Sequence, residues 1–227
     1  MLLGADAIER LQNSHVAVFG LGGVGSWCAE ALARSGIGEL TLVDQDTVAE
    51  SNINRQLVAT HGTIGRSKAR VMADRIADIS PDIKAHPVCE RYEAENRERF
   101  FQSRYDYIVD AIDLVACKLD LIETSLRLGI PIISALGAGN KLDASLMQIC
   151  DISKTRGCAL ARVMRRELRR RGINHHTVVY SPEESVKPQQ AEEPPPGRRS
   201  VPGSLVWVTA TSGMLLAQHV VLSLSKG

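Results

Sequence analysis

Short apolar segments alternate with helix-like segments through the first 140 residues of this chain. Five runs rich in branched side chains have the length of buried strands: 15–20, 39–43, 83–88, 107–110 and 130–134. Apolar residues at helical spacing lie between them, most clearly from Lys68 to Ile79. Strands and helices that alternate in this way form a parallel, doubly wound sheet with right-handed crossovers. We therefore predict a Rossmann-like, mainly parallel α/β fold, in which ligands bind beyond the carboxyl ends of the strands.

The pattern changes after residue 140. One more strand-like run covers 146–152, and a basic helix-like run covers 158–171. The segment 186–203 holds five of the nine prolines and predicts a mobile loop. We expect a core of residues 1–140 and a C-terminal extension, 141–227, within one domain.

The last apolar segment, Val201–Ser225, contains no Asp, Glu, Lys or Arg. Several polar residues and Gly213 interrupt it, which favours a helix that returns to the core over a membrane span. The five cysteines are scattered and form no Cys-x-x-Cys pair, so they indicate reduced thiols of a cytoplasmic protein.

A glycine-rich loop joins the first strand to the next helix. Its sequence is Gly-Leu-Gly-Gly-Val-Gly, with glycines at Gly20, Gly22, Gly23 and Gly25. Such a loop lets the backbone approach phosphate, and the helix N-terminus supplies free N–H groups. Asp44 ends the second strand, where a ribose-binding acid belongs. These features alone predict a nucleotide site, for which a nicotinamide-dependent dehydrogenase is the usual interpretation.

A second polar cluster follows Asp44 and Asp46. It contains four residues: Ser51, Asn52, Asn54 and Arg55. Lys68 then opens the next helix. Two cations beside a phosphate site suit a reaction in which negative charge develops on phosphate, whereas hydride transfer needs neither. Arg55 alone fits a surface ion pair and Lys68 alone a solvated helix residue, so the prediction depends on their combination.

Asp113 follows the fourth strand. A carboxylate there can hold the Mg²⁺ that bridges ATP phosphates, although it could also cap the next helix. We predict Arg55, Lys68 and Asp113 as catalytic residues, with Asp113 as the metal ligand. The predicted nucleotide-binding set is Gly20, Gly22, Gly23, Gly25, Asp44, Asp46, Ser51, Asn52, Asn54, Arg55, Lys68 and Asp113.

The basic run has an apolar helical face and an arginine-rich remainder. Its arginines are Arg162, Arg165, Arg166, Arg169 and Arg170. Charge runs are usually solvated helix faces. On a chain with a formal net charge of +1, however, a local cluster is also the kind of surface that contacts nucleic acid phosphates. We predict these five arginines as a nucleic-acid contact.

Together these motifs resemble the adenylating superfamily that includes ubiquitin-activating, molybdopterin-synthase-activating and ThiF-like enzymes. The match runs from about Leu11 to Ala138. The resemblance implies that residues 1–140 form an ATP-binding core with ATP and Mg²⁺ as cofactors. It also implies that a substrate carboxylate attacks the α-phosphate, giving an acyl-adenylate and pyrophosphate.

Longer stretches are similar to the tRNA threonylcarbamoyladenosine dehydratases. They are Gly25–Gly38, Ala135–Asp143, Asp151–Thr155 and Pro202–Ala217. This resemblance implies a cytoplasmic homodimer that acts on tRNA. The carboxylate of a threonylcarbamoyl group on an anticodon-loop adenosine is adenylated, and the neighbouring carbamoyl group closes a ring with net loss of water and release of AMP.

The resemblance also implies an arginine upstream of the position of Leu2, which a dimer partner lends to the other subunit's ATP. The printed sequence has no counterpart, so we expect either further upstream residues or one charge fewer at the transition state. Three alternatives therefore remain open: an adenylyltransferase that activates a ubiquitin-like sulfur carrier, a dehydrogenase, and a scaffold without activity. The sulfur-carrier enzymes commonly bind zinc through Cys-x-x-Cys pairs, which are absent here.

Overall fold

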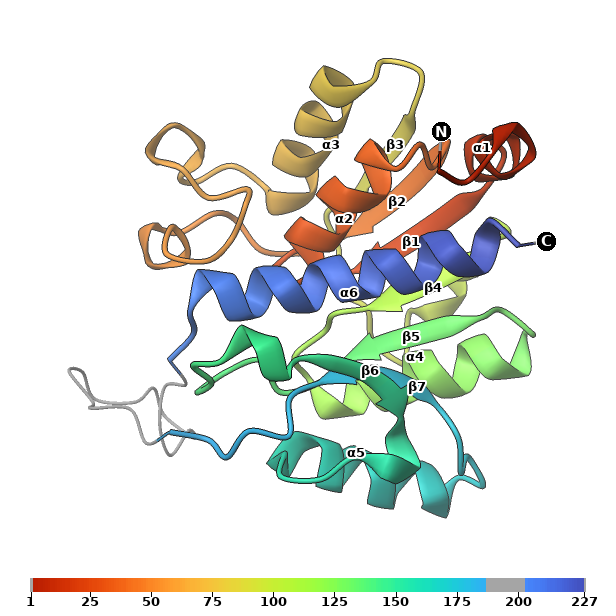
Figure 1. Cartoon of the computed structure of the whole chain (residues 1–227). Helices are drawn as coiled ribbons and strands as arrows, with labels where there is room; N and C mark the ends of the chain where they lie inside the picture. Colours follow the sequence, from red (N-terminus) through yellow and green to blue (C-terminus); the bar gives the residue numbers. More distant parts are fainter. Residues whose placement is uncertain (1, 187–202, 227) are drawn as a thin grey trace.

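A seven-stranded sheet forms the centre of the computed structural model, which describes residues 2–186 and 203–226 (Figure 1). The strand order is β3-β2-β1-β4-β5-β7-β6; all neighbours pair in parallel except β6 and β7, which are antiparallel. The strands are β1 His15–Phe19, β2 Glu39–Val43, β3 Lys84–Val88, β4 Tyr107–Asp110, β5 Ile132–Ala135, β6 Gln148–Asp151 and β7 Thr177–Tyr180. The predicted mainly parallel, doubly wound α/β fold is confirmed.

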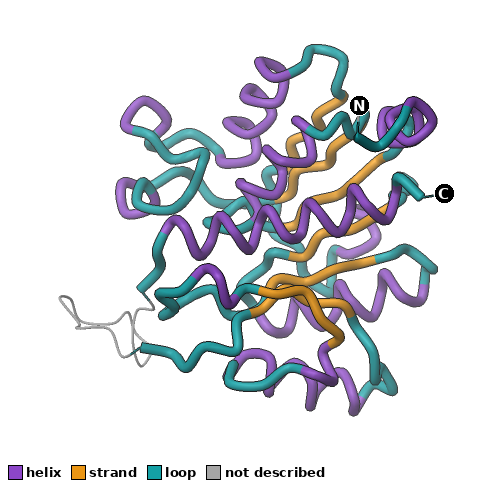
Figure 2. The backbone as a smooth tube through the Cα atoms, in the orientation of Figure 1, coloured by secondary structure: helices purple, strands orange, loops and turns teal. Residues whose placement is uncertain are grey.

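Helices cover both faces of this sheet (Figure 2). They are α1 Ala5–Gln12, α2 Gly25–Arg34, α3 Lys68–Ile79, α4 Val115–Arg127, α5 Ala159–Arg170 and α6 Val206–Leu224. Helices α1, α2, α3 and α6 contribute to the core on one face, and α4 and α5 to the core on the other. Because β1 pairs in parallel with both β2 and β4, the carboxyl ends of these three strands lie at one edge of the sheet, which we call the carboxyl edge.

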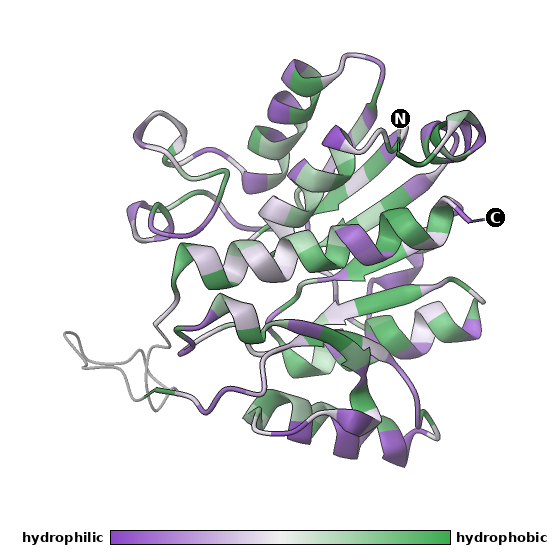
Figure 3. Ribbon diagram, in the orientation of Figure 1, coloured by the Kyte–Doolittle hydropathy of each residue, from purple (hydrophilic) through white to green (hydrophobic). Residues whose placement is uncertain are grey.

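The central strand β1 is buried on both faces. Val16 and Val18 belong to the core beneath α2 and α6, whereas Ala17 and Phe19 belong to the core beneath α4 and α5. Successive side chains of a strand point to opposite faces, so a strand between two helical layers is mostly apolar along its length, as Val16–Phe19 are. Figure 3 shows this as a continuous hydrophobic centre.

The final apolar segment forms helix α6, as expected. It is the one helix in the described ranges that is long and apolar enough to cross a membrane, and 44% of its most apolar window is buried within the protein. Gly213 allows its close approach to α2: a Cβ atom there would lie 2.5 Å from the Val24 carbonyl oxygen and 2.9 Å from the Cys28 nitrogen. The two helix backbones thus touch at this point, so any larger side chain must push them apart.

Two elements were not anticipated from the sequence, α1 and β7. β7 inserts between β5 and β6, and this arrangement turns β6 antiparallel to its neighbour. The weak third strand is confirmed as β3, and it keeps Pro87 because it lies at the sheet edge, where a missing N–H is tolerated. Most of the predicted mobile loop 186–203 lies outside the described residues.

Asn140 joins the two chain segments that flank residues 187–202. Its N–H donates to the Gly203 carbonyl at 2.7 Å, its side-chain Oδ1 accepts from the Gly203 N–H at 2.7 Å, and its carbonyl accepts from the Val186 N–H at 2.9 Å. Asn140 has a φ of 57°, a left-handed conformation that asparagine tolerates better than most residues. One residue therefore holds Val186 and Gly203 next to each other.

Candidate nucleotide-binding site

The four glycines of the glycine-rich loop have different roles in the structure. Gly20 has a φ of 89°, and a Cβ atom on it would lie 2.6 Å from the Ala111 carbonyl oxygen. A Cβ atom on Gly25 would lie 1.8 Å from the Gly20 carbonyl oxygen. These two glycines are therefore required by the turn and by close packing of α2 on the strands.

Gly22 and Gly23 leave their backbone open toward the carboxyl edge. A Cβ atom on Gly22 would meet only the Gln56 side chain, at 3.9 Å. The N–H groups of Gly22, Gly23 and Val24 have no acceptor within residues 2–186 and 203–226. Because they precede the first turn of α2, they can bind an anion together with the helix dipole.

Asp44 is fixed against the glycine-rich loop. One of its carboxylate oxygens accepts the Leu21 N–H at 2.7 Å, and the other accepts the Asp46 N–H at 2.8 Å. Burial raises the pKa of this carboxyl above its ordinary value, although both N–H donors act in the opposite direction. The carboxylate is thus held at the end of β2 with lone pairs free to accept further hydroxyl groups.

Arg55 lies across the glycine-rich loop. Its aliphatic stem contacts the position of Gly23, with Cγ 3.2 Å from where a Cβ atom would lie. Its guanidinium donates to the Ser51 carbonyl and to the Asn54 side chain, both at 2.9 Å. Trp27 of α2 donates its indole N–H to the Arg55 carbonyl at 3.0 Å and fixes the backbone. The arginine predicted from the sequence therefore lies beside the predicted phosphate loop.

The amides near Arg55 also shape their own segment. Asn52 accepts the Ala49 N–H at 3.2 Å, and Asn54 donates to the Ser204 carbonyl at 3.1 Å, next to the start of α6. Thr209 of α6 also lies beside Gly23, with its Cβ 3.3 Å from where a Cβ atom on this glycine would lie. The start of α6 is thus part of the surroundings of the site, which the sequence analysis missed.

Lys68 is the first residue of α3 and only 5% exposed. Its ammonium group donates to the Asp46 carboxylate at 2.9 Å, and its backbone N–H bonds to the Asp46 carbonyl at 3.0 Å. The carboxylate partner is itself exposed. An incoming phosphate can compete for this ammonium group without leaving a buried carboxylate behind.

Asp113 lies in the turn between β4 and α4, and its side chain is exposed. The same turn carries Ala111, whose carbonyl contacts the Gly20 position. In the described ranges, no group of three or more His, Cys, Asp or Glu could hold a metal ion. Mg²⁺ is commonly held by one or two carboxylates with substrate phosphates and water, so a single exposed Asp113 beside the glycine-rich loop fits such an ion.

The basic helix α5 begins near the carboxyl edge. Its N-cap residue Cys158 lies against Gly137, which follows β5 closely: a Cβ atom there would be 2.5 Å from the sulfur. Figure 3 shows hydrophilic residues along its outer side. Four of the five predicted arginines are exposed: Arg162, Arg166, Arg169 and Arg170.

Arg165 differs from the other arginines of α5. Its guanidinium donates to the Thr155 carbonyl at 2.7 Å and to the Thr155 hydroxyl at 2.6 Å. The exposed Arg166 and Arg170 share the half-buried Glu167 as an ion-pair partner, at 3.0 and 3.1 Å. Arg165 therefore has a structural role, and the remaining four arginines form the accessible basic surface.

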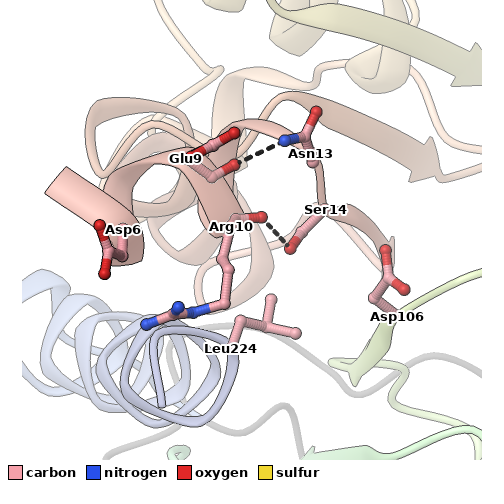
Figure 4. Close-up of a pocket in the computed structure, with 7 residues that line it drawn as sticks. All are labelled: Asp6, Glu9, Arg10, Asn13, Ser14, Asp106 and Leu224. Atoms are coloured by element: carbon pink, nitrogen blue, oxygen red, sulfur yellow. Dashed lines mark hydrogen bonds between the residues drawn. The ribbon is translucent and has the colours of Figure 1, made fainter. Parts of the chain in front are cut away.

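A cavity of about 470 Å³ lies at the opposite, amino edge of the sheet (Figure 4). It is lined by Asp6, Glu9, Arg10, Asn13, Ser14, Asp106 and Leu224. Its carboxylates are unsuited to a triphosphate, and none of the predicted site residues lies there. The carboxyl edge, where Arg55 and Lys68 lie, is therefore the candidate nucleotide site.

Gln56 is a further residue that sequence reasoning missed. It is 7% exposed, its Oε1 is buried without a hydrogen-bond partner in the described residues, and its Nε2 faces Gly22. Its position directly after Arg55 was the signal available in the sequence. It adds an uncharged amide to the floor of the glycine-rich loop.

Comparison with known proteins identifies the family. The model of the ThiF family matches residues 1–226. The chain belongs to the ThiF family. A tRNA threonylcarbamoyladenosine dehydratase of Bacillus subtilis (strain 168) is 40% identical over 235 residues, which cover 100% of this chain and 92% of the relative.

Solved structures of ThiF-family proteins agree with this assignment. The tRNA N6-threonylcarbamoyladenosine dehydratase of E. coli, solved with ATP, has a TM-score of 0.88 and 35% identity, covering 98% of this chain and 90% of that one. The same enzyme solved with AMP gives a TM-score of 0.89.

Among the sequence relatives, the sulfur carrier protein ThiS adenylyltransferase of E. coli (strain K12) is 33% identical, but over only 62% of this chain and 56% of its own length.

Proposed function

We propose that this protein is an ATP-dependent tRNA threonylcarbamoyladenosine dehydratase. The observation that carries the proposal is the extent of the similarity. It continues past the adenylating core through α5, β7 and α6, and covers 98% of the chain in the comparison with the ATP-bound enzyme. The phosphate-binding N–H groups, Arg55 and Lys68 gather at one edge, as adenylation of a carboxylate requires.

The proposed reaction has two steps. A substrate carboxylate oxygen attacks the α-phosphorus of ATP, the bond to the bridging oxygen breaks, and pyrophosphate leaves. The neighbouring carbamoyl group then attacks the acyl carbon, loses a proton and expels AMP, so the nucleoside loses one water overall. Arg55 and Lys68 stabilise the negative charge that develops on the phosphates, because fixed cations in a partly desolvated site need little reorganisation. Asp44 binds the ribose hydroxyls.

Asp113 is proposed as the ligand of Mg²⁺. When bound, the ion neutralises phosphate charge and orients the pyrophosphate leaving group. The exposed carboxylate lies in the turn that contacts Gly20, so it can reach phosphates held by the glycine-rich loop. The nucleophile of the second step belongs to the substrate, so no cysteine of this chain is needed for the reaction.

We also propose the exposed arginines of α5 as the tRNA contact and a homodimer as the assembly. The dimer is supported by α6, which has no charged residue and leaves Trp207, Met214 and Leu222 exposed.

A single domain is supported by the C-terminal strands β6 and β7, which extend the same sheet as β5. A cytoplasmic location follows from a tRNA substrate. Sedimentation of the purified chain measures the assembly directly.

The alternative is adenylation of a sulfur carrier protein. It would use the same carboxyl edge, since the first step is identical. The shorter match to the ThiS adenylyltransferase, which covers 62% of this chain, favours the dehydratase.

The first experiment measures AMP release from ATP·Mg²⁺ with and without tRNA that carries threonylcarbamoyladenosine. We expect AMP release that depends on this tRNA, and loss of one water from the modified nucleoside by mass spectrometry. Lys68→Ala and Asp113→Ala should each reduce AMP formation by about 10²-fold or more, while cooperative thermal unfolding is retained. Release of AMP that depends instead on a sulfur carrier C-terminus would support the alternative.

Matched surface variants control for the changes of charge. Lys84 and Asp82 are exposed and lie at the amino edge, near the start of β3. Lys84→Ala and Asp82→Ala should keep the parental rate. Parental turnover by Lys68→Ala or Asp113→Ala would show that the assigned role of that residue is wrong.

A further inference from the structure

A fully buried ion pair lies beneath the turn that carries Asp113. The Lys118 ammonium group of α4 is 2.8 Å from a carboxylate oxygen of Asp110, the last residue of β4, and the side chains are 1% and 0% exposed. None of the roles proposed above uses either residue. Burying two charges is costly, and such a pair often contributes less to stability than apolar residues of similar volume would. Its clearest physical effect is to fix one geometry.

The pair closes the β4–α4 turn from both ends. The second carboxylate oxygen of Asp110 accepts the Ile112 N–H at 3.1 Å, and the Lys118 N–H bonds to the Leu114 carbonyl at 2.9 Å. The same ammonium group lies 3.5 Å from the Asp110 carbonyl oxygen. Asp113 therefore lies between two hydrogen bonds, one from the Ile112 N–H to the Asp110 carboxylate and one between the backbones of Lys118 and Leu114. The Lys118–Asp110 ion pair joins the two.

The turn is also coupled to the glycine-rich loop. The Ala111 N–H donates to the Phe19 carbonyl at 2.8 Å, and the Ala111 carbonyl oxygen fills the space beside Gly20. A shift of Asp110 would therefore move both the carboxylate of Asp113 and the start of the phosphate-binding loop. Within residues 2–186 and 203–226, the exposed Asp113 side chain makes no hydrogen bond or ion pair that would fix it in the same way.

We propose that the Lys118–Asp110 pair is a positioning pair, which holds the β4–α4 turn so that Asp113 faces the metal and phosphates of the bound nucleotide. This inference rests on the metal role of Asp113 proposed above. Lys118 and Asp110 touch neither substrate nor metal, and they act through the turn. Residues that orient a metal ligand typically change metal affinity or activity by about 10- to 100-fold when replaced.

The test separates positioning from stability. Lys118→Met leaves a buried carboxylate without its partner, so it is made alone and together with Asp110→Leu, which removes both charges. We expect the folded double variant to need about tenfold more Mg²⁺ for half-maximal AMP formation and to turn over about tenfold more slowly. Its affinity for ATP in the presence of EDTA should stay within about twofold of the parent. Lys118→Arg, which keeps the charge, should restore much of the rate.

Two controls fix the interpretation. Glu30→Gln weakens an ion pair between α2 and α3, where the buried Glu30 binds the partly exposed Arg75 at 2.6 Å, and should lower the unfolding temperature without changing the Mg²⁺ requirement. Asp113→Asn tests the underlying role: parental activity there would overturn the metal assignment itself. If Asp113→Asn is inactive but the double variant keeps the parental rate and Mg²⁺ requirement, the positioning role of the Lys118–Asp110 pair is wrong. The metal role of Asp113 would then still hold.

Discussion

His176 shows how a single buried side chain can set the response of this protein to acid. Its ring Nε2 is 2.8 Å from the hydroxyl oxygen of Ser134 on β5, and the residue is buried. Burial, with a smaller contribution from the nearby Lys118, lowers the pKa of His176 to about 4. The imidazole is therefore neutral in the folded protein at neutral pH. In the unfolded chain its pKa returns to the ordinary value of about 6.5.

Because of this shift in pKa, proton binding by His176 favours the unfolded chain. Between the unfolded pKa of about 6.5 and the folded pKa of about 4, the unfolded chain binds a proton that the folded protein does not. The free energy of unfolding should then fall as the pH falls, by at most about 1.4 kcal/mol per pH unit from this group. His176→Gln supplies an amide that can either donate to or accept from the Ser134 hydroxyl, and it should remove this contribution to the slope.

The measurement is urea unfolding at several values of pH between 4 and 7. His61→Gln, which alters an exposed histidine, should keep the parental slope. An unchanged slope in His176→Gln would show that other groups cause the acid sensitivity.

At the scale of elements, helices α2 and α6 pack with their backbones in close contact at Gly213. Gly213→Ala would place a Cβ atom 2.5 Å from the Val24 carbonyl oxygen, and backbone cannot move aside as a flexible side chain can. We expect a loss of about 1 to 3 kcal/mol in unfolding free energy, the usual cost of overpacking. Because Val24 borders the glycine-rich loop, ATP should also bind more weakly.

Gly62→Ala is the matched control, since a Cβ atom there meets nothing within 4 Å. Urea denaturation and ATP titration of both variants provide the comparison. Equal stability of Gly213→Ala and the parent would mean that α6 can shift at little cost.

The sequence predicted the elements whose signals are local. The strand run ending at Gly20, the helix Lys68–Ile79 and the apolar C-terminal helix appear as expected. β7, Thr177–Tyr180, was missed because it follows the basic helix-like run, outside the regular alternation of the first 140 residues, and its place in the sheet depends on pairing with β5 and β6. The orientation of β6 depends on that pairing and could not be predicted either.

In the candidate site, too, some residues could be predicted from their place in the sequence and others could not. Residue types at fixed positions after a strand, such as Asp44 and Asp113, could be predicted from the chain itself. Contacts from distant segments could not, which is why Thr209 and the structural hydrogen bonds of Arg165 were missed. The separate roles of Gly20 and Gly22 likewise required the position of Ala111 in space.

At the scale of the whole molecule, the proposed tRNA binding by a near-neutral chain depends on local charge. Arg162 and Arg169 of α5 are exposed, so each can release counterions when it contacts a phosphate. We expect Arg162→Ala and Arg169→Ala each to weaken tRNA binding and to reduce the slope of log affinity against log salt by about 0.7 to 0.9. Titrations at several salt concentrations measure this slope.

Two arginines serve as comparisons in the same assay. Arg165→Ala should change the salt slope less, because its guanidinium is bound to Thr155. Arg99→Ala, at a 71% exposed side chain outside α5, should not change it. Equal effects at Arg99 and Arg162 would mean that α5 is not the tRNA contact.

The hydrogen bonds of Asn140 have a practical consequence for protein engineering. Because Val186 and Gly203 are both held by this one residue, the ends of any segment between them are already close together. The entropy of closing a flexible loop changes slowly with its length, by about 0.6 kcal/mol for each doubling. This junction is therefore a suitable place to insert an affinity tag or a fluorescent reporter, leaving both chain termini free.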